Sequence, residues 1–350
     1  MRRLSALGGL AALALAACGT SQHVAPRHVA LVYVNESGSA VLARAGGGGP
    51  RVLGPAKQAL LSPNGTDVVA LRSNGTQATL TLYGTGRHAG SRLVAVLAPP
   101  DFSAHGVRLL AWSPDSRFVA LSVEELSAAG AQGALVVLDV ASGELETIAT
   151  GTILGASFAP QPPDRLVYAR ASIAQLDDNE ASLWVARGDG WRRRRLTATG
   201  LASAPLWTAR GIVFASLQRL GSETSSPLYS LWQIQPDGRG AARLAAFTAG
   251  PPASAEALSA STSGRRIVAD FDAPDGGPVE VWQLALTARG VSARELTLPG
   301  LGILADGISR NGKLILVTVF GAQSQVASLS WDATHQRTLA SPAGVANWND

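Results

Sequence analysis

Three acidic residues lie close together in the segment Asp270-Phe-Asp272-Ala-Pro-Asp275-Gly276. Calcium loops place carboxylates on alternate residues, so that several oxygens converge on one hard cation. Here the third acid comes one residue late and a proline intervenes. The spacing therefore favours a solvated turn. We expect no cofactor, and calcium bound by Asp270, Asp272 and Asp275 is the alternative.

Two further acidic groups could recognise a basic partner. They are the pair Glu124-Glu125 and the group formed by Asp177, Asp178 and Glu180. Each lies in a polar stretch that follows an apolar run with strand composition, so we expect both groups on loops. Binding residues are often found on loops that a rigid scaffold holds in place.

Signals for catalysis are weak throughout the chain. There is no Gly-x-Ser-x-Gly nucleophile motif, and no two of the five histidines have the i, i+4 spacing of a zinc-binding helix. Cys18 is the only cysteine, which excludes a disulfide within the chain and a cysteine-ligated metal. We therefore predict a protein that is not an enzyme. The alternative is a hydrolase, a lyase or a carbohydrate-binding lipoprotein with a divalent metal, for which His105 is the best-placed histidine.

The N-terminal segment indicates export and lipid attachment. Arg2 and Arg3 precede an apolar stretch, residues 4–15, that is too short to span a membrane stably. The segment ends Leu15-Ala-Ala-Cys18-Gly19, which resembles the bacterial lipobox, where cleavage precedes a cysteine that then carries lipid. We predict a signal peptide at residues 1–17, a lipidated tether at 18–27 and one folded domain at 28–350. An ordinary secretory signal is the alternative.

The basic residues do not indicate a nucleic-acid partner. The formal net charge is +4, and 27 of the 29 basic residues are arginines. The densest run is Trp191-Arg-Arg-Arg-Arg195. It precedes a Leu-Thr pair in a segment that we expect to be an outer strand, where alternate arginines point into solvent.

A repeated pattern determines the expected architecture. An apolar residue and a small polar residue precede a turn and a short apolar run, as in Trp112-Ser-Pro-Asp-Ser116 and Ile308-Ser-Arg-Asn-Gly312. Successive copies are 51, 46, 49, 53 and 48 residues apart, and a last copy at Trp348 follows after 40. A fixed period in this range indicates stacked supersecondary units. Four short strands per period correspond to one blade of a β-propeller.

One unit carries a family resemblance. It consists of Trp112-Ser-Pro-Asp115 and Phe118-Val-Ala-Leu121, followed by Leu135-Val-Val-Leu-Asp139 and Leu145-Glu-Thr-Ile148. This order of segments is similar to the TolB-like propeller repeat, a relative of the WD-repeat. The Gly-His pair of WD-repeats is missing, and a Trp-Asp pair occurs only at Trp331-Asp332. The resemblance covers almost the whole mature chain. It implies an all-β propeller and says little about function.

The two ends of the domain decide the number of blades. Residues 28–53 contain three strand-like runs, and residues 345–350 contain one more. Joining the four runs in one blade closes the ring and removes its exposed sheet edges. We therefore predict an all-β, seven-bladed propeller of four-stranded antiparallel blades. Six blades with a loose N-terminal hairpin is the alternative, because TolB-like rings often have six.

This strand order predicts two unlike faces. Long loops gather on one face of the ring and short turns, rich in arginine, on the other. The expected partner-binding residues of the long-loop face are Glu124, Glu125, Asp177, Asp178, Glu180, Asp270, Asp272 and Asp275.

We therefore predict an extracytoplasmic lipoprotein, anchored to the cell membrane by the lipid on Cys18, that binds an envelope protein or peptide. We expect a monomer, a membrane contact through the lipid anchor, and no nucleic-acid partner. Three tryptophans follow the same period, and we expect them to pack between blades: Trp184, Trp232 and Trp282.

Overall fold

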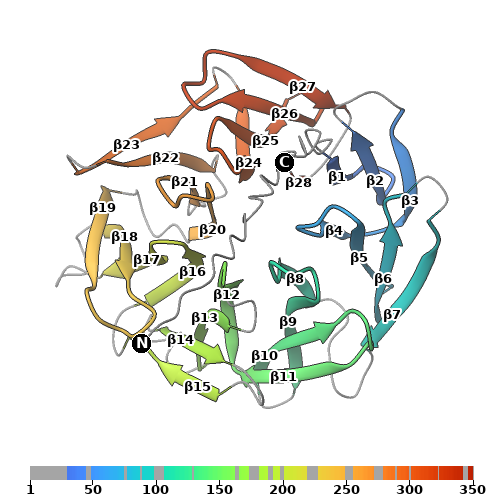
Figure 1. Cartoon of the computed structure of the whole chain (residues 1–350), viewed down its shortest axis with the longest axis horizontal. Helices are drawn as coiled ribbons and strands as arrows, with labels where there is room; N and C mark the ends of the chain where they lie inside the picture. The colour runs from blue at the N-terminus through green and yellow to red at the C-terminus, as the bar shows by residue number, and fades with distance from the viewer. Residues whose placement is uncertain are drawn as a thin grey trace, which may run out of the picture.

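The computed structural model is an all-β ring of seven four-stranded antiparallel sheets. It describes residues 30–44, 49–74, 77–86, 89–97, 106–127, 130–161, 165–172, 181–187, 192–197, 201–218, 228–248, 255–271, 279–287, 290–298, 301–321, 323–341 and 346–349. The sheets follow one another in chain order around a central axis (Figure 1). In this part of the chain no helix is long and apolar enough to cross a membrane.

The blades are numbered around the ring, and the strands of each are given from the axis outward. Blade 1 consists of β28 (Ala346–Asn349), β1 (Ala30–Val34), β2 (Ser39–Arg44) and β3 (Arg51–Pro55). Blade 2 consists of β4 (Gln58–Leu61), β5 (Asp67–Ser73), β6 (Ala78–Gly84) and β7 (Ser91–Leu97). Blade 3 consists of β8 (Arg108–Trp112), β9 (Phe118–Ser127), β10 (Gly130–Asp139) and β11 (Leu145–Thr150).

The other blades repeat the same order. Blade 4 consists of β12 (Thr152–Phe158), β13 (Arg165–Ala171), β14 (Ser182–Arg187) and β15 (Arg192–Arg195). Blade 5 consists of β16 (Leu201–Thr208), β17 (Gly211–Gln218), β18 (Leu228–Ile234) and β19 (Ala242–Thr248). Blade 6 consists of β20 (Ala255–Ala260), β21 (Arg266–Phe271), β22 (Glu280–Thr287) and β23 (Gly290–Leu296). Blade 7 consists of β24 (Gly302–Ile308), β25 (Leu314–Phe320), β26 (Gln325–Ser330) and β27 (Gln336–Ala340).

The seven-blade prediction is confirmed, including the blade shared by the two ends of the chain. β28 pairs with β1 in antiparallel register, Ala30 opposite Asn349 and Tyr33 opposite Ala346. The six-blade alternative is wrong, because β1, β2 and β3 are built into the ring through β28.

Each second strand is buried on both faces, since a neighbouring blade covers each of them. In β25 the residues from Ile315 to Val319 are all buried, which explains why this run, apolar except for Thr318, does not alternate. Burial falls outward, and all four arginines of the outermost strand β15 are exposed. Radial position in the blade therefore accounts for the strand compositions.

The repeated turn is held by its small polar residue. In blade 3, Ser113 is fully buried; its Oγ donates to Asp115 at 2.5 Å and accepts from the backbone N–H of Phe118 at 2.8 Å. In blade 7, Ser309 makes the same pair of bonds with Asn311 (3.0 Å) and Leu314 (2.8 Å). In these two blades the serine thus satisfies the buried end of the turn and fixes the start of the second strand.

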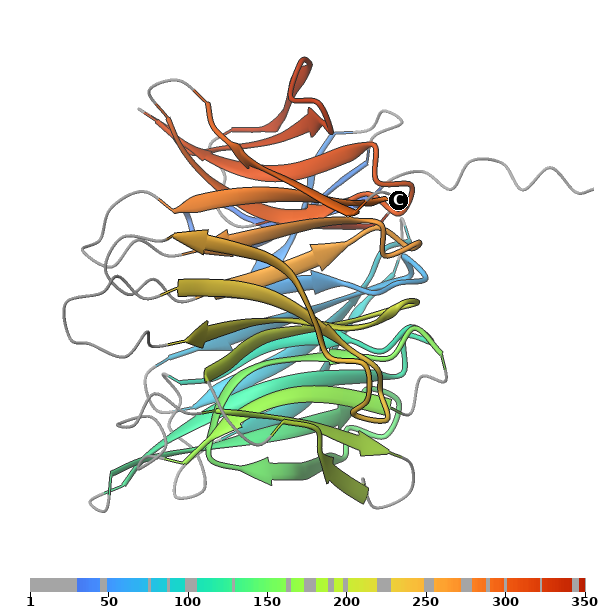
Figure 2. The ribbon, with the colours of Figure 1, turned by 90° about the vertical axis from the view of Figure 1, so that its left-hand side faces the viewer.

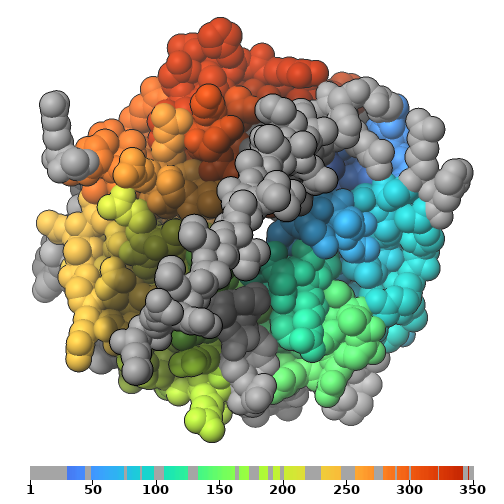
Figure 3. Space-filling model, in the orientation of Figure 1, coloured from blue at the N-terminus to red at the C-terminus, as the bar shows by residue number. Residues whose placement is uncertain are grey.

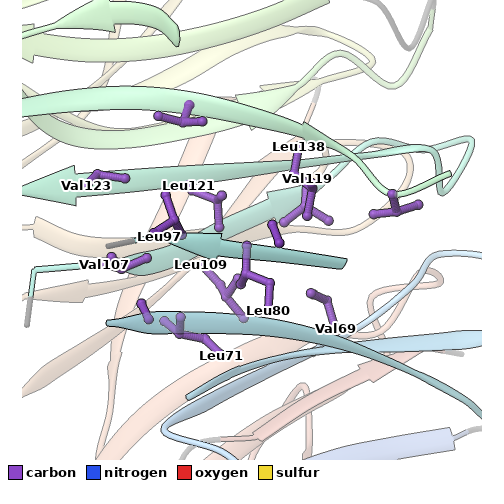
Figure 4. Packing of buried hydrophobic residues seen from close by; sticks show 14 of the residues in the cluster. Val69, Leu71, Leu80, Leu97, Val107, Leu109, Val119, Leu121, Val123 and Leu138 are labelled. Carbon is purple, nitrogen blue, oxygen red and sulfur yellow. The ribbon is translucent and has the colours of Figure 1, made fainter. Parts of the chain in front are cut away.

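Apolar side chains form the contacts between blades. Figure 4 shows Leu71 and Leu80 of blade 2 against Leu109 and Leu121 of blade 3. Comparable clusters join every other pair of neighbours, including blade 7 with blade 1, where Leu316 packs with Leu31 and Ala346. The blades accordingly form a closed ring (Figure 3).

The three periodic tryptophans pack between blades, as predicted. Trp184 packs against the cluster between blades 3 and 4, Trp232 against that between blades 4 and 5, and Trp282 against that between blades 5 and 6. Their positions explain why their spacing follows the blade period.

Candidate functional site: the central channel

The inner strands of the seven blades surround a cavity of about 560 Å³ on the propeller axis. Residues from all seven blades line it. This volume lies within the range of ligand-binding cavities in proteins. The channel is therefore the candidate binding site.

One ring of the channel wall contains a single carboxylate among apolar side chains. The ring is formed by the residue two positions before the apolar residue that begins the repeated pattern in each blade. In blade order they are Ala346, Ala59, Leu110, Ala156, Pro205, Leu258 and Asp306. Six of these seven side chains cannot hydrogen-bond, so Asp306 is the one titratable residue among these seven.

A β-bulge places Asp306 on the channel wall. In the pairing of β24 with β25, Ala305 lies opposite Val317 and Gly307 opposite Leu316, which leaves Asp306 as the extra residue. A bulge of this kind redirects a side chain out of the regular alternation of a strand.

The Asp306 carboxyl is buried and incompletely hydrogen-bonded. Oδ2 accepts a hydrogen bond from Thr318 Oγ1 at 2.7 Å, whereas Oδ1 is buried without a hydrogen-bond partner. Burial raises the pKa of Asp306 to about 7; the Thr318 hydroxyl and the nearby backbone amide of Ala346 act in the opposite direction. The group is therefore close to half-protonated at neutral pH, and a cation in the channel would favour its ionised form.

Asp270 supports the same wall from the neighbouring blade. It lies near the end of β21, is 1% exposed, and lines the channel. Its two carboxylate oxygens accept from the backbone N–H of Ala305, each at 3.2 Å. We expected Asp270 on an exposed loop, and this expectation is wrong, because the residue is buried within β21. Here the carboxylate fixes the backbone next to Asp306.

Replacing Asp270 by alanine should destabilise the protein by about 1–3 kcal/mol, because the buried N–H of Ala305 loses its acceptor. Urea unfolding followed by tryptophan fluorescence measures this. The matched control is Glu124→Ala, which removes an exposed acid and should cost less than about 0.5 kcal/mol. Equal unfolding curves for the two variants would show that Asp270 does not support the channel wall.

Positive charge lies on the other side of the channel. Lys57 and Arg108, from blades 2 and 3, are exposed and line the cavity, whereas Asp306 belongs to blade 7. Within the described residues, neither cation forms an ion pair with a carboxylate within 4 Å. The channel thus has an acidic side and a basic side that do not neutralise each other by direct contact.

The remaining predicted site residues are only partly described. Glu124 is exposed near the end of β9, and its backbone N–H donates to the carbonyl of Gly106 at 3.2 Å. Glu125 lies in β9, but its side chain is outside the described part of the structure. Also outside it are Cys18, His105, Asp177, Asp178, Glu180, Asp272 and Asp275.

The structure therefore leaves partner binding by the acidic loops, and the calcium alternative, as predictions. Across the described segments, no three His, Cys, Asp or Glu side chains come together as metal ligands. Sequence reasoning missed Asp306, Lys57 and Arg108. The sequence feature that could have indicated Asp306 is its position as the one acid in the otherwise apolar run Ile303-Leu-Ala-Asp-Gly-Ile308.

Comparison with known proteins supports the fold. No family model and no curated protein matches the chain. Among solved structures, TolB from Acinetobacter baumannii matches with 17% identity and a TM-score of 0.52, over 80% of this chain and 65% of that one. The chain thus spans just under two thirds of that TolB.

Two further structures show the same fold in proteins of other kinds. Oligogalacturonate lyase from Vibrio parahaemolyticus matches with 14% identity and a TM-score of 0.57, over 80% of this chain and 79% of that one. The propeller domain of the Trilobed protease from Pyrococcus furiosus, described as having an open velcro topology, matches with 11% identity and a TM-score of 0.60, over 90% and 93%. This chain is a seven-bladed β-propeller with a TolB-like fold.

Proposed function

We propose that the protein is a non-enzymatic, lipid-anchored propeller of the bacterial cell envelope that binds a peptide segment of a partner protein in its central channel. The observation that carries the proposal is the channel itself, whose apolar ring contains one buried carboxyl, Asp306. The fold supports a scaffold role, and the lipobox-like segment ending at Cys18 supports the location.

The charges of the channel indicate the chemistry of the segment. Asp306 favours a basic side chain, because a cation near a buried carboxyl stabilises its ionised form. Lys57 and Arg108 favour an acidic side chain or a C-terminal carboxylate. A short segment carrying both charges, with small apolar residues between them, would complement the channel.

A photo-reactive p-benzoylphenylalanine at Leu258, which belongs to the Asp306 ring, tests the proposal in cells that produce the full chain. We expect a cross-link to one defined envelope protein, reduced at least about tenfold by Asp306→Asn. The matched control carries the probe at Leu93, on the exposed outer strand β7, and should not capture this protein. Capture of the same protein from both positions, or capture that Asp306→Asn leaves unchanged, would refute binding in the channel.

A further inference from the structure

A second cavity, of about 590 Å³, lies between blades 4 and 5, and half of the residues that line it are arginines. Blade 5 supplies Trp207 and residues 235–237 of the turn between β18 and β19. Blade 4 supplies Val185 and five arginines: Arg165, Arg187, Arg192, Arg193 and Arg194. We call this cavity the arginine groove.

Three of these arginines stand side by side on neighbouring strands. Arg165 of β13 lies opposite Arg187 of β14, which lies opposite Arg192 of β15. Residues directly opposite one another in a sheet share a face, and like charges in such pairs are destabilising. The sheet therefore holds three guanidinium groups in an arrangement that an anion would stabilise.

Nothing in the described part of the chain neutralises these charges. No carboxylate lies within 4 Å of Arg165, Arg187 or Arg192 there, and Arg165 Nε is buried without a hydrogen-bond partner. The described acid of the groove, Asp237, is exposed, and its nearest cation is Arg239, at 3.9 Å. The groove consequently combines a buried unpaired donor with an excess of positive charge.

The opposite wall of the groove is held in place by Arg194. Its Nη1 donates to the carbonyl of Asp237 at 2.9 Å, and its Nη2 donates to that of Pro236 at 2.5 Å. These two bonds tie β15 to the blade 5 turn. The groove is thus prepared before a ligand arrives, which lowers the entropic cost of binding.

We propose that the arginine groove binds a phosphate group. Guanidinium groups bind phosphate through paired, charge-assisted hydrogen bonds, and several of them match its multiple oxygens and negative charge. The volume accommodates the phosphate together with part of the molecule that carries it. This site is separate from the channel and does not depend on the function proposed for it.

Two sources of phosphate fit the position of the groove. Arg165 begins the second strand of blade 4, and Ala30 begins the second strand of blade 1. Because the second strands of all blades run in the same direction between the two faces, both residues lie on the same face of the ring. Figure 2 shows the ring from its edge, with the strands running between the two faces. The tether predicted from the sequence precedes Ala30, and a lipid anchor on it makes the headgroups of anionic phospholipids one source. A soluble phosphate compound is the other source.

Isothermal titration of the full chain in neutral detergent tests the site. The probes are inorganic phosphate and the short-chain lipid dihexanoyl phosphatidylglycerol, with dihexanoyl phosphatidylcholine for comparison. We expect saturable binding of at least one anionic probe, weakened about tenfold or more in Arg187→Gln. In chloride buffer without either probe, Arg187→Gln should melt at the same temperature as the wild type or higher, because repulsion between the arginines is relieved.

The matched control is Arg265→Gln, which removes one exposed charge on the same face in blade 6 and should leave binding unchanged. Tighter binding of the phosphatidylglycerol than of inorganic phosphate would identify a lipid headgroup as the source, and the reverse order a soluble phosphate. The proposal fails if neither anionic probe saturates below about 10 mM. It also fails if Arg187→Gln and Arg265→Gln bind equally. Neither of these results would affect the proposal for the channel, which the cross-link at Leu258 tests separately.

Discussion

Deleting residues 346–350 should open the ring and lower the free energy of unfolding by about 3–6 kcal/mol. The deletion removes the backbone pairing of β28 with β1 and uncovers buried Leu31 and Tyr33, which pack with Ala346. Both losses lower the stability of the folded state. The exposed edge of β1 should also promote association, because an unpaired strand edge can pair with another chain. Urea unfolding and size-exclusion chromatography measure the two effects.

The control for this truncation removes Asp350 alone, which leaves all of β28 in place. It should unfold like the wild type and stay monomeric. If the longer deletion also behaves in this way, closure through β28 does not stabilise the ring.

Asp306 should make the protein less stable as the pH rises from 5 towards 7. Its pKa is about 7 in the folded protein, against 3.8 for the unperturbed group, so the folded state holds this proton more tightly than the unfolded chain does. The stability that this proton contributes is fully present below the pKa of Asp306 in the unfolded chain. It is lost as the pH rises through the pKa of Asp306 in the folded protein. Between pH 5 and pH 8.5 the loss should be about 2–3 kcal/mol.

The variant Asp306→Asn should lack this pH dependence and should be more stable than the wild type at pH 8.5 by about 1–4 kcal/mol. Its side-chain oxygen can still accept the Thr318 hydrogen bond, while the charge is removed. Urea unfolding at several pH values measures both the pH dependence of stability and the difference in stability between the two proteins at pH 8.5. Glu124→Gln serves as the control, because that side chain is exposed. Parallel pH profiles for the wild type and Asp306→Asn would contradict the burial of this carboxyl.

Much of the fold could be predicted because the second strand of every blade is buried in the same way. A second strand covered on both faces needs a largely apolar run, and in several blades a buried hydroxyl such as that of Ser113 or Ser309 holds the turn before it. Trp348 extended this pattern to the last residues of the chain, which allowed the shared blade to be predicted.

The site was harder to predict, because it depends on pairing between strands. Asp306 reaches the channel through a bulge, and a bulge has no local sequence signature that distinguishes it from a regular strand residue. Asp270 was expected on a loop, but β21 continues to Phe271 and carries it into the sheet. The register of Arg165, Arg187 and Arg192 likewise depends on how three strands align.

The most direct test of the channel proposal is the number of protons released when the partner binds. The segment captured by the cross-link can be synthesised and titrated calorimetrically at pH 7 in two buffers with different ionisation enthalpies. Because the Asp306 carboxyl is close to half-protonated at that pH, a basic segment should release about half a proton per molecule bound. Asp306→Asn should bind more weakly and release none. Binding of equal affinity to both proteins, with no proton released by the wild type, would contradict recognition through Asp306.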